Sequence, residues 1–105
     1  MNKVYSFLGL AQRAGKLVSG EQAVESEVRK GRVIFMIIAS NASKNTRTKF
    51  MSLAHNYNIK CQIYGNKEEL GTAIGKSRRA VIGIVDRNFA NMIRTHINES
   101  VHKKN

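Results

Sequence analysis

The sequence lacks the features that cross-link a protein through disulfides or anchor it in a membrane. It contains a single cysteine, Cys61, so no disulfide can form within the chain, and we expect a reduced, cytoplasmic setting. No stretch approaches the roughly 18 apolar residues that a membrane-spanning helix needs. Residues 1–6 lack the apolar run of a secretory signal, so we expect no export. Proline is absent too, and we attach no functional meaning to that.

Groups that perform chemistry are also sparse. Nucleophilic catalysis needs a nucleophile, a base and a group that orients the base. The histidines, however, fall in separate segments, at His55, His96 and His102. None of them is spaced with Cys61 in the paired pattern of a zinc site. We therefore expect no enzyme activity, no metal and no cofactor.

One segment looks at first like a phosphate-binding loop, the run Gly71-Thr72-Ala73-Ile74-Gly75-Lys76-Ser77. Its two glycines are separated by one residue fewer than that motif requires, and Leu70 stands where the first glycine belongs. The segment also follows a helical pattern and leads into a strand, which reverses the order of a phosphate loop. We therefore do not interpret it as a nucleotide site.

What the sequence has in excess is positive charge. Its 18 Lys and Arg against 7 Asp and Glu give a formal net charge of +11 and an isoelectric point near 10.3. Like charges repel one another in a compact chain, so such an excess is typical of proteins that bind polyanions. Solubility is served by a smaller net charge. Nucleic acid is therefore the leading class of partner, and we expect no membrane partner.

Hydrophobic spacing predicts alternating helices and strands in one domain that covers residues 1–105. The predicted helices are residues 3–14, 19–31, 44–57, a short helix after Asn66, and a last helix lined by Phe89, Met92, Ile93 and Ile97. The predicted strands are residues 32–39, 59–64 and 80–85, with a short extended piece at residues 16–18. Residues 100–105 are expected to form a frayed tail. Strands that alternate with helices, without hairpin signals, indicate an α/β fold whose sheet lies between helices.

Two details of this pattern concern individual side chains. Ser19 and Gln22 have the spacing of a capping box, as do Asn66 and Glu69, so each pair is expected to begin a helix. The third helix is expected to carry its inward side on Phe50, Met51, Leu53, Ala54 and Tyr57.

Two polar segments lie outside the apolar stripes and are candidates for one RNA surface. They are residues 16–22, at the start of the second helix, and the basic loop at residues 75–79. A helix N-terminus offers unpaired backbone N–H groups and a positive dipole end, and Gly20 lets the backbone approach closely. The candidate RNA-binding residues are Lys16, Ser19, Gly20, Glu21, Gln22, Lys30, Lys76, Ser77, Arg78 and Arg79.

Structural roles compete with RNA contact at several of these positions. Helix capping alone explains Ser19 and Gln22 about as well as RNA contact does. For Arg78 and Arg79 we favour RNA contact over a merely solvated loop, because adjacent cations repel unless an anion screens them. Lys30 more readily complements the dipole at the end of the second helix.

Three stretches resemble a known family. They are Lys16-Leu17-Val18-Ser19-Gly20-Glu21-Gln22-Ala23-Val24, then Gly31 with Phe35-Met36-Ile37-Ile38-Ala39, and Glu68-Glu69-Leu70-Gly71-Thr72-Ala73-Ile74-Gly75-Lys76. Together they resemble the ribosomal-protein family of the seven-Ae and thirty-e type, and most closely its small bacterial YlxQ-like branch. The resemblance runs from about residue 4 to residue 98. The combination of Leu-Gly-x-Ala-x-Gly with the Gly20 helix start is fairly specific.

The resemblance implies a three-layer α/β/α sandwich with a mixed central sheet of about four strands and helices on both faces. It also implies binding to kink-turn RNA, a sharply bent duplex with tandem sheared G·A pairs beside a bulge. In the family, the start of the second helix reads the G·A pairs, and the loop before the last strand covers a nucleotide flipped from the bulge. Gly20, Glu21 and Gln22 occupy the first place, and residues 74–80 the second.

The sequence departs from the family's pattern at the same two places. The family's best RNA binders carry Gly-x-Asn-Glu at the helix start and a lysine four residues after that Asn. Here those positions hold Gln22, Ala23 and Ser26, which lack the carboxylate and the cation. The loop, Lys76-Ser77-Arg78-Arg79, is more basic than the family's apolar tip. Affinity or target is therefore expected to differ.

Three hypotheses follow, in this order. The first is a monomeric, non-catalytic protein that binds structured RNA at a kink-turn or related bent motif, in ribosomal particles or another noncoding RNA. The alternative is a module for ribonucleoprotein assembly or protein interaction whose RNA contacts are nonspecific. The third, an enzyme acting on RNA, is disfavoured because the chain has no room for a second, catalytic domain.

Overall fold

Helices and strands alternate along the chain as the hydrophobic spacing predicts. A computed structural model describes residues 2–102, with the side chains of residues 2–100. The described elements are α1 (Lys3–Arg13), β1 (Leu17–Ser19), α2 (Glu21–Arg29), β2 (Phe35–Ile38), α3 (Lys44–Asn56), β3 (Lys60–Ile63), α4 (Lys67–Ala73), β4 (Val81–Ile84) and α5 (Arg87–His102). None of the helices among these residues is both long and apolar enough to cross a membrane.

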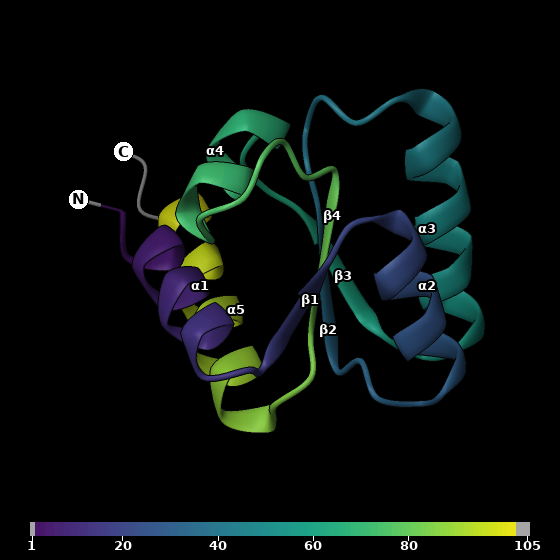
Figure 1. Cartoon of the computed structure of the whole chain (residues 1–105), viewed down its shortest axis with the longest axis horizontal. Coiled ribbons are helices and arrows are strands. Elements are labelled where there is room, and N and C mark those ends of the chain that lie inside the picture. The colour runs from purple at the N-terminus through teal and green to yellow at the C-terminus, as the bar shows by residue number, and fades with distance from the viewer. Residues whose placement is uncertain (1, 103–105) are drawn as a thin grey trace.

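The strands form one mixed sheet in the order β1-β4-β2-β3. β4 is antiparallel to both of its neighbours, β1 and β2, whereas β2 and β3 are parallel. It follows that β1, β2 and β3 point the same way and end at one edge of the sheet, where β4 begins. Figure 1 shows α1, α4 and α5 covering one face and α2 and α3 covering the other. The three-layer sandwich with a mixed sheet is thus confirmed.

The core lies on both faces of the two inner strands. Every residue of β2 and β4 is buried, as the nearly continuous apolar run around residues 35–38 predicts. Leu8, Phe50 and Ile93 are fully buried against them from three different helices. Each such side chain contributes about 1.5–3 kcal/mol when it leaves water. The core therefore holds the sheet rigid beneath the connecting loops at its ends.

Several predictions about element ends and faces were wrong. β2 begins at Phe35 rather than at residue 32, because α2 ends at Arg29 and Gly31, at a φ of 76°, first turns the chain back toward the sheet. Met51 is 50% exposed and Tyr57 is 42% exposed. Met51 lies about 100° around the helix from the buried Phe50, and Tyr57 is the C-cap of α3 and so lies beyond its inward stripe. α5 continues through residues 100–102, which were expected to fray, and residues 103–105 lie outside the described part.

Candidate nucleic-acid interface

Three helices begin at the same end of the sheet. α2, α3 and α4 follow β1, β2 and β3, whose carboxyl ends share one edge, and residues 75–80 enter β4 beside them (Figure 1). The first turn of a helix presents N–H groups without helical partners and the positive end of the dipole. This end of the molecule is consequently suited to anions, even before side-chain charges are counted.

Gly20 begins α2 in a backbone conformation that side chains rarely allow. Its φ of 92° and ψ of 154° fall in a region that is essentially restricted to glycine. A Cβ atom at Gly20 would meet nothing within 4 Å, so the backbone conformation requires glycine and crowding does not. The Gly20 N–H donates to the Val81 carbonyl at 3.0 Å, which holds the start of α2 against β4. The helix start is therefore rigid and open to solvent.

The capping-box prediction for Ser19 and Gln22 was wrong. Gly20 is the N-cap of α2, and no side chain caps that helix. The Ser19 hydroxyl instead accepts a hydrogen bond from Arg79 Nε at 3.0 Å. The equivalent prediction at Asn66 was right, because its side chain accepts from the Glu69 N–H at 2.8 Å.

Arg79 fastens the loop at residues 75–80 to its surroundings. Besides the bond to Ser19, its guanidinium donates to the Ser77 hydroxyl at 3.0 Å and to the Arg78 carbonyl at 3.1 Å. Its backbone N–H donates to the Lys67 carbonyl at 3.1 Å. Arg79 is accordingly half-buried and structural as well as cationic.

The same loop packs on α4 at a glycine. A Cβ atom at Gly71 would overlap the carbonyl group of Ser77, and the Lys76 N–H donates to the Gly71 carbonyl at 2.9 Å. Only a residue without a side chain lets the loop lie so close to the helix. The first glycine of the Leu-Gly-x-Ala-x-Gly segment is thus explained by close packing.

A hollow of about 380 Å³ lies between these elements. Its lining consists of Gly20, Glu21, Ser43, Thr46, Lys67, Arg78, Arg79 and Ala80. Glu21 is held at its rim, because Thr46 donates to the Glu21 carboxylate at 3.0 Å and itself accepts from Ser43 at 3.0 Å. The lining thus combines three cations, one oriented carboxylate and two hydroxyl groups, a set that can contact both phosphates and base edges.

Arg78 is already paired with a carboxylate. Its Nε lies 3.1 Å from Glu68 Oε2, and Asn41 donates to the other oxygen of Glu68 at 3.2 Å. The pKa of Glu68 is lowered by a hydrogen bond from its own backbone N–H, by the Asn41 amide and by the charge of Arg78. Both side chains are exposed, so the pair is weak. A phosphate can replace Glu68 as the partner of Arg78 at small cost.

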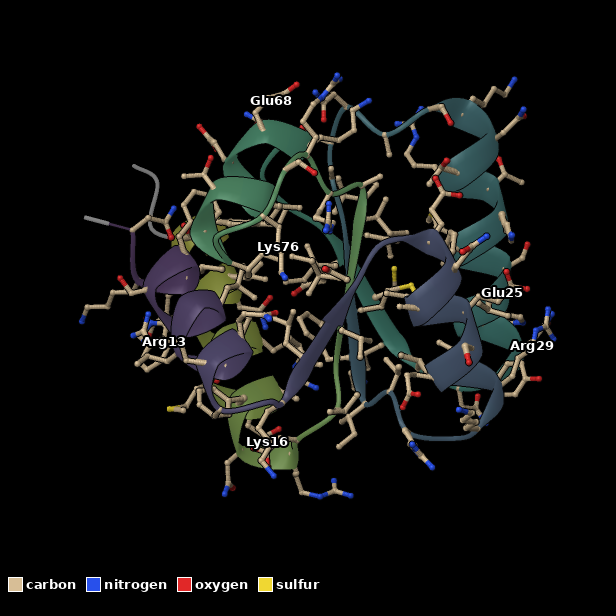
Figure 2. The ribbon with its side chains drawn as sticks, in the orientation of Figure 1. Arg13, Lys16, Glu25, Arg29, Glu68 and Lys76 are labelled. Carbon is tan, nitrogen blue, oxygen red and sulfur yellow. The ribbon has the colours of Figure 1, made fainter. Side chains whose placement is uncertain are left out.

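The structure divides the sequence-predicted residues into two groups. Those at this end line the hollow, bond to Arg79 or lie exposed nearby: Ser19, Gly20, Glu21, Gln22, Ser77, Arg78 and Arg79. Gln22 is exposed but does not line the hollow, and Lys76 is exposed and lies nearer the middle of the molecule in Figure 2. Lys16 precedes β1 and Lys30 follows α2, so both lie at the opposite end of the sheet. Figure 2 shows Lys16 at the lower end of the molecule and Glu68 at the upper end.

The sequence analysis missed three residues of the hollow, Ser43, Thr46 and Lys67. Ser43 is the N-cap of α3, and Lys67 is the first residue of α4. The available signal was positional, because each follows a strand that runs parallel to β1, and parallel strands bring their following loops to one edge. No group of three or more His, Cys, Asp or Glu side chains that could hold a metal ion occurs within the described residues.

Comparison with known proteins finds one matching family and relatives of similar sequence. The model of the ribosomal protein L7Ae/L30e/S12e/Gadd45 family matches residues 2–93. Over 89 residues the chain is 36% identical to the RNA-binding protein YlxQ of Bacillus subtilis (strain 168), covering 85% of this chain and 89% of that protein. Over 88 residues it is also 36% identical to the RNA-binding protein YlxQ of Enterococcus faecium, covering 84% of each.

Solved structures are similar over nearly the same span. A protein of unknown function from Bacillus halodurans C has a TM-score of 0.90 and 38% identity, over 94% of this chain and 100% of that chain. The Giardia lamblia 15.5kD RNA binding protein has a TM-score of 0.77 over 92% of this chain and 83% of that chain. At 16% identity, the second likeness concerns the fold alone.

Proposed function

Because the chain belongs to the ribosomal protein L7Ae/L30e/S12e/Gadd45 family, we propose that it is a non-catalytic protein that binds structured RNA at the hollow beside Gly20. The observation that carries the proposal is the meeting of the rigid α2 start with the basic loop at residues 75–80, through the bond between Arg79 and Ser19. The names of the Bacillus subtilis and Enterococcus faecium relatives, both RNA-binding proteins, support the same partner.

The RNA motif that we propose is a kink-turn or a closely related bend. The start of α2 presents the backbone at Gly20, the oriented Glu21 carboxylate and the exposed Gln22 amide, which can hydrogen-bond the edges of sheared G·A pairs. The hollow, at about 380 Å³, falls in the size range of sites that enclose small groups, roughly 300–1,000 Å³, and suits an extruded nucleotide. Lys67 and Arg79 supply charge for the phosphates beside it.

The remaining parts of the proposal concern context. Residues 1–105 act as one RNA-binding domain, as a monomer in the cytoplasm, on a ribosomal particle or another noncoding RNA. Two positions on the exposed face of α2, Ala23 and Ser26, offer neither a carboxylate nor a cation. We therefore propose that the loop at residues 75–80 contributes more to RNA affinity than α2 does.

The experiment is a titration by fluorescence anisotropy at about 0.15 M salt, a physiological ionic strength. It compares a kink-turn RNA with the same RNA whose G·A pairs are replaced by Watson–Crick pairs. We expect tighter binding to the intact kink-turn. Neutralising about five phosphates also gives a log-log salt slope of roughly −3.5 to −4.5. Equal affinity for the two RNAs would favour the alternative, an assembly module with nonspecific RNA contact.

A further inference from the structure

A second cluster of positive side chains lies at the end of the sheet opposite the hollow. We define it as the basal surface, made of Lys16, Lys60 and Arg87. Lys16 precedes β1, Lys60 begins β3 and Arg87 begins α5 directly after β4. All three side chains are exposed. Figure 2 shows Lys16 at this lower end, far from Glu68 beside the hollow.

The strand register places these three cations along one edge. Leu17 pairs with Ile84, Ile84 with Phe35, and Phe35 with Lys60, so one row crosses the whole sheet. The Val85 N–H donates to the Lys16 carbonyl at 3.0 Å, which brings Lys16 beside the segment that leads to Arg87. Neighbouring strands lie about 4.8 Å apart, so the row spans about 14 Å.

Within residues 2–100, the cations of the basal surface have no carboxylate partner, a property that they share with cations elsewhere, such as Lys3 and Lys67. Among the described side chains, no ion pair includes Lys16, Lys60 or Arg87. By contrast, Arg29 and Lys49 both pair with Glu25. Lys30 and Arg32, which also lie at this end, share Glu27 at 3.7 and 3.5 Å. No ion pair among the described residues therefore neutralises the basal surface, and its charge is available to an external anion.

The one carboxylate in the loop before α5 is otherwise engaged. Asp86 accepts a hydrogen bond from the Phe89 N–H at 2.9 Å, and so caps the start of α5. An acidic cap of this kind leaves Arg87 without an ion-pair partner and fixes the direction in which the helix begins.

Helix dipoles explain the positions of Lys16 and Lys60 but not that of Arg87. Lys16 and Lys60 come shortly after the ends of α1 and α3, where cations complement the negative end of a helix. Arg87 lies in the first turn of α5, which has no acidic residue. A cation at that end is unfavourable by about 0.3–1 kcal/mol. A bound polyanion would offset this cost.

We infer that the basal surface holds the phosphate backbone of a second RNA segment while the hollow holds the first, so that the protein bridges two RNA segments. The inference rests on the proposed function, because RNA in the hollow is its premise. The partner is RNA backbone rather than a specific sequence, since three exposed cations on flexible stems offer charge without a fixed pattern of donors and acceptors.

The test immobilises biotinylated kink-turn RNA, loads the full-length protein, and measures capture of a fluorescent straight RNA duplex from solution. The wild type is expected to capture the duplex. Lys16→Glu with Arg87→Glu is expected to abolish most of the capture. Where residual capture by this variant can still be measured, log affinity for the duplex should depend less steeply on log salt concentration than in the wild type. The slope should be smaller in magnitude by about 2, at about 0.9 per lost phosphate contact.

The matched control is Lys3→Glu with Lys49→Glu. It makes the same change in net charge on two exposed lysines of α1 and α3 that belong neither to the lining of the hollow nor to the basal surface. Circular dichroism of both variants checks that they fold. We expect the control to keep capture of the duplex.

Three results would overturn the inference. If the basal variant captured as much duplex as the wild type, the basal surface would not be the second RNA-binding site. An equal loss in the control would mean that net charge alone attracts the duplex. If the wild-type protein washes off the immobilised kink-turn RNA, the proposed function is overturned, and the bridging inference falls with it. This result is seen before the duplex is added, so it is distinguished from failure of the basal surface alone.

Discussion

Arg79 and Ser19 are sixty positions apart in sequence, yet Arg79 Nε donates a hydrogen bond to Ser19 Oγ at 3.0 Å. Ser19 is the last residue of β1 and directly precedes the glycine that begins α2. Arg79 is the next residue but one before β4. The bond therefore makes one unit of the helix start and the loop, the two halves of the candidate interface.

This relationship predicts coupling between the two side chains. Ser19→Ala should weaken kink-turn binding about fivefold, which is equivalent to about 1 kcal/mol, the worth of a partly exposed bond to a charged group. In an Arg79→Ala background the same change should have little further effect. Affinities of the two single variants and the double variant, measured by anisotropy, complete the cycle. Strictly additive effects would show that Ser19 acts independently of Arg79.

The contact between Gly71 and the Ser77 carbonyl predicts a loss of stability on Gly71→Ala. The added Cβ cannot be accommodated without moving the loop away from α4. Overpacking of this kind costs about 1–3 kcal/mol, and each kcal/mol lowers the melting temperature by about 4–8 °C in a domain of this size. Thermal unfolding followed by circular dichroism measures it. Thr72→Ala, at the exposed next position of the same helix, is the control and should leave the melting temperature nearly unchanged.

Two glycines with positive φ allow strain to be separated from function. Gly20→Ala should destabilise the fold by about 1–3 kcal/mol, because alanine avoids its backbone conformation. Gly31→Ala, at a φ of 76° at the opposite end, should destabilise by about 1–2 kcal/mol for a similar reason. At a temperature where both variants are folded, only Gly20→Ala should weaken binding to kink-turn RNA. Equal affinities for the two variants would show that the start of α2 does not contact the RNA.

Sequence periodicity predicted most of the fold because the two inner strands of the sheet, β2 and β4, are wholly buried. Residues 35–38 are apolar without interruption, as a strand buried on both faces must be. Met51 was misplaced for a geometric reason, since one residue is enough to rotate a side chain from the core to solvent. Periodicity therefore predicts which elements exist better than which residues at their margins are buried.

The candidate site was harder to predict because it depends on contacts that are distant in sequence. Capping-box spacing at Ser19 describes a local partner, whereas the actual partner, Arg79, is remote and invisible to spacing rules. Lys16 was grouped with Gly20 because the two are close in sequence. A strand of three residues between them places them at opposite ends of the sheet. Strand direction, which only the fold supplies, decides which charges act together.

The single thiol provides a pH-dependent test of the packing at the outer strand. Burial raises the pKa of Cys61 from 9.0 to about 11. As pH rises above 9, the thiol in the unfolded chain loses its proton while the thiol in the folded chain keeps it. The unfolded state then binds fewer protons than the folded state, so the free energy of unfolding must fall between pH 9 and pH 11.

Urea denaturation at a series of pH values between about 7 and about 10.5 measures this fall. Tyr5 contributes a decline of its own, because burial and the adjacent Glu69 raise the pKa of its phenol. The contribution of Cys61 is therefore the difference between the wild type and Cys61→Ala, which lacks the thiol but keeps Tyr5. We expect the variant to lose less stability than the wild type over this range, and to differ from it by a constant amount below pH 8. Parallel curves at every pH would mean that Cys61 titrates normally, and that the contacts of β3 with the helices around it are looser than the structure describes.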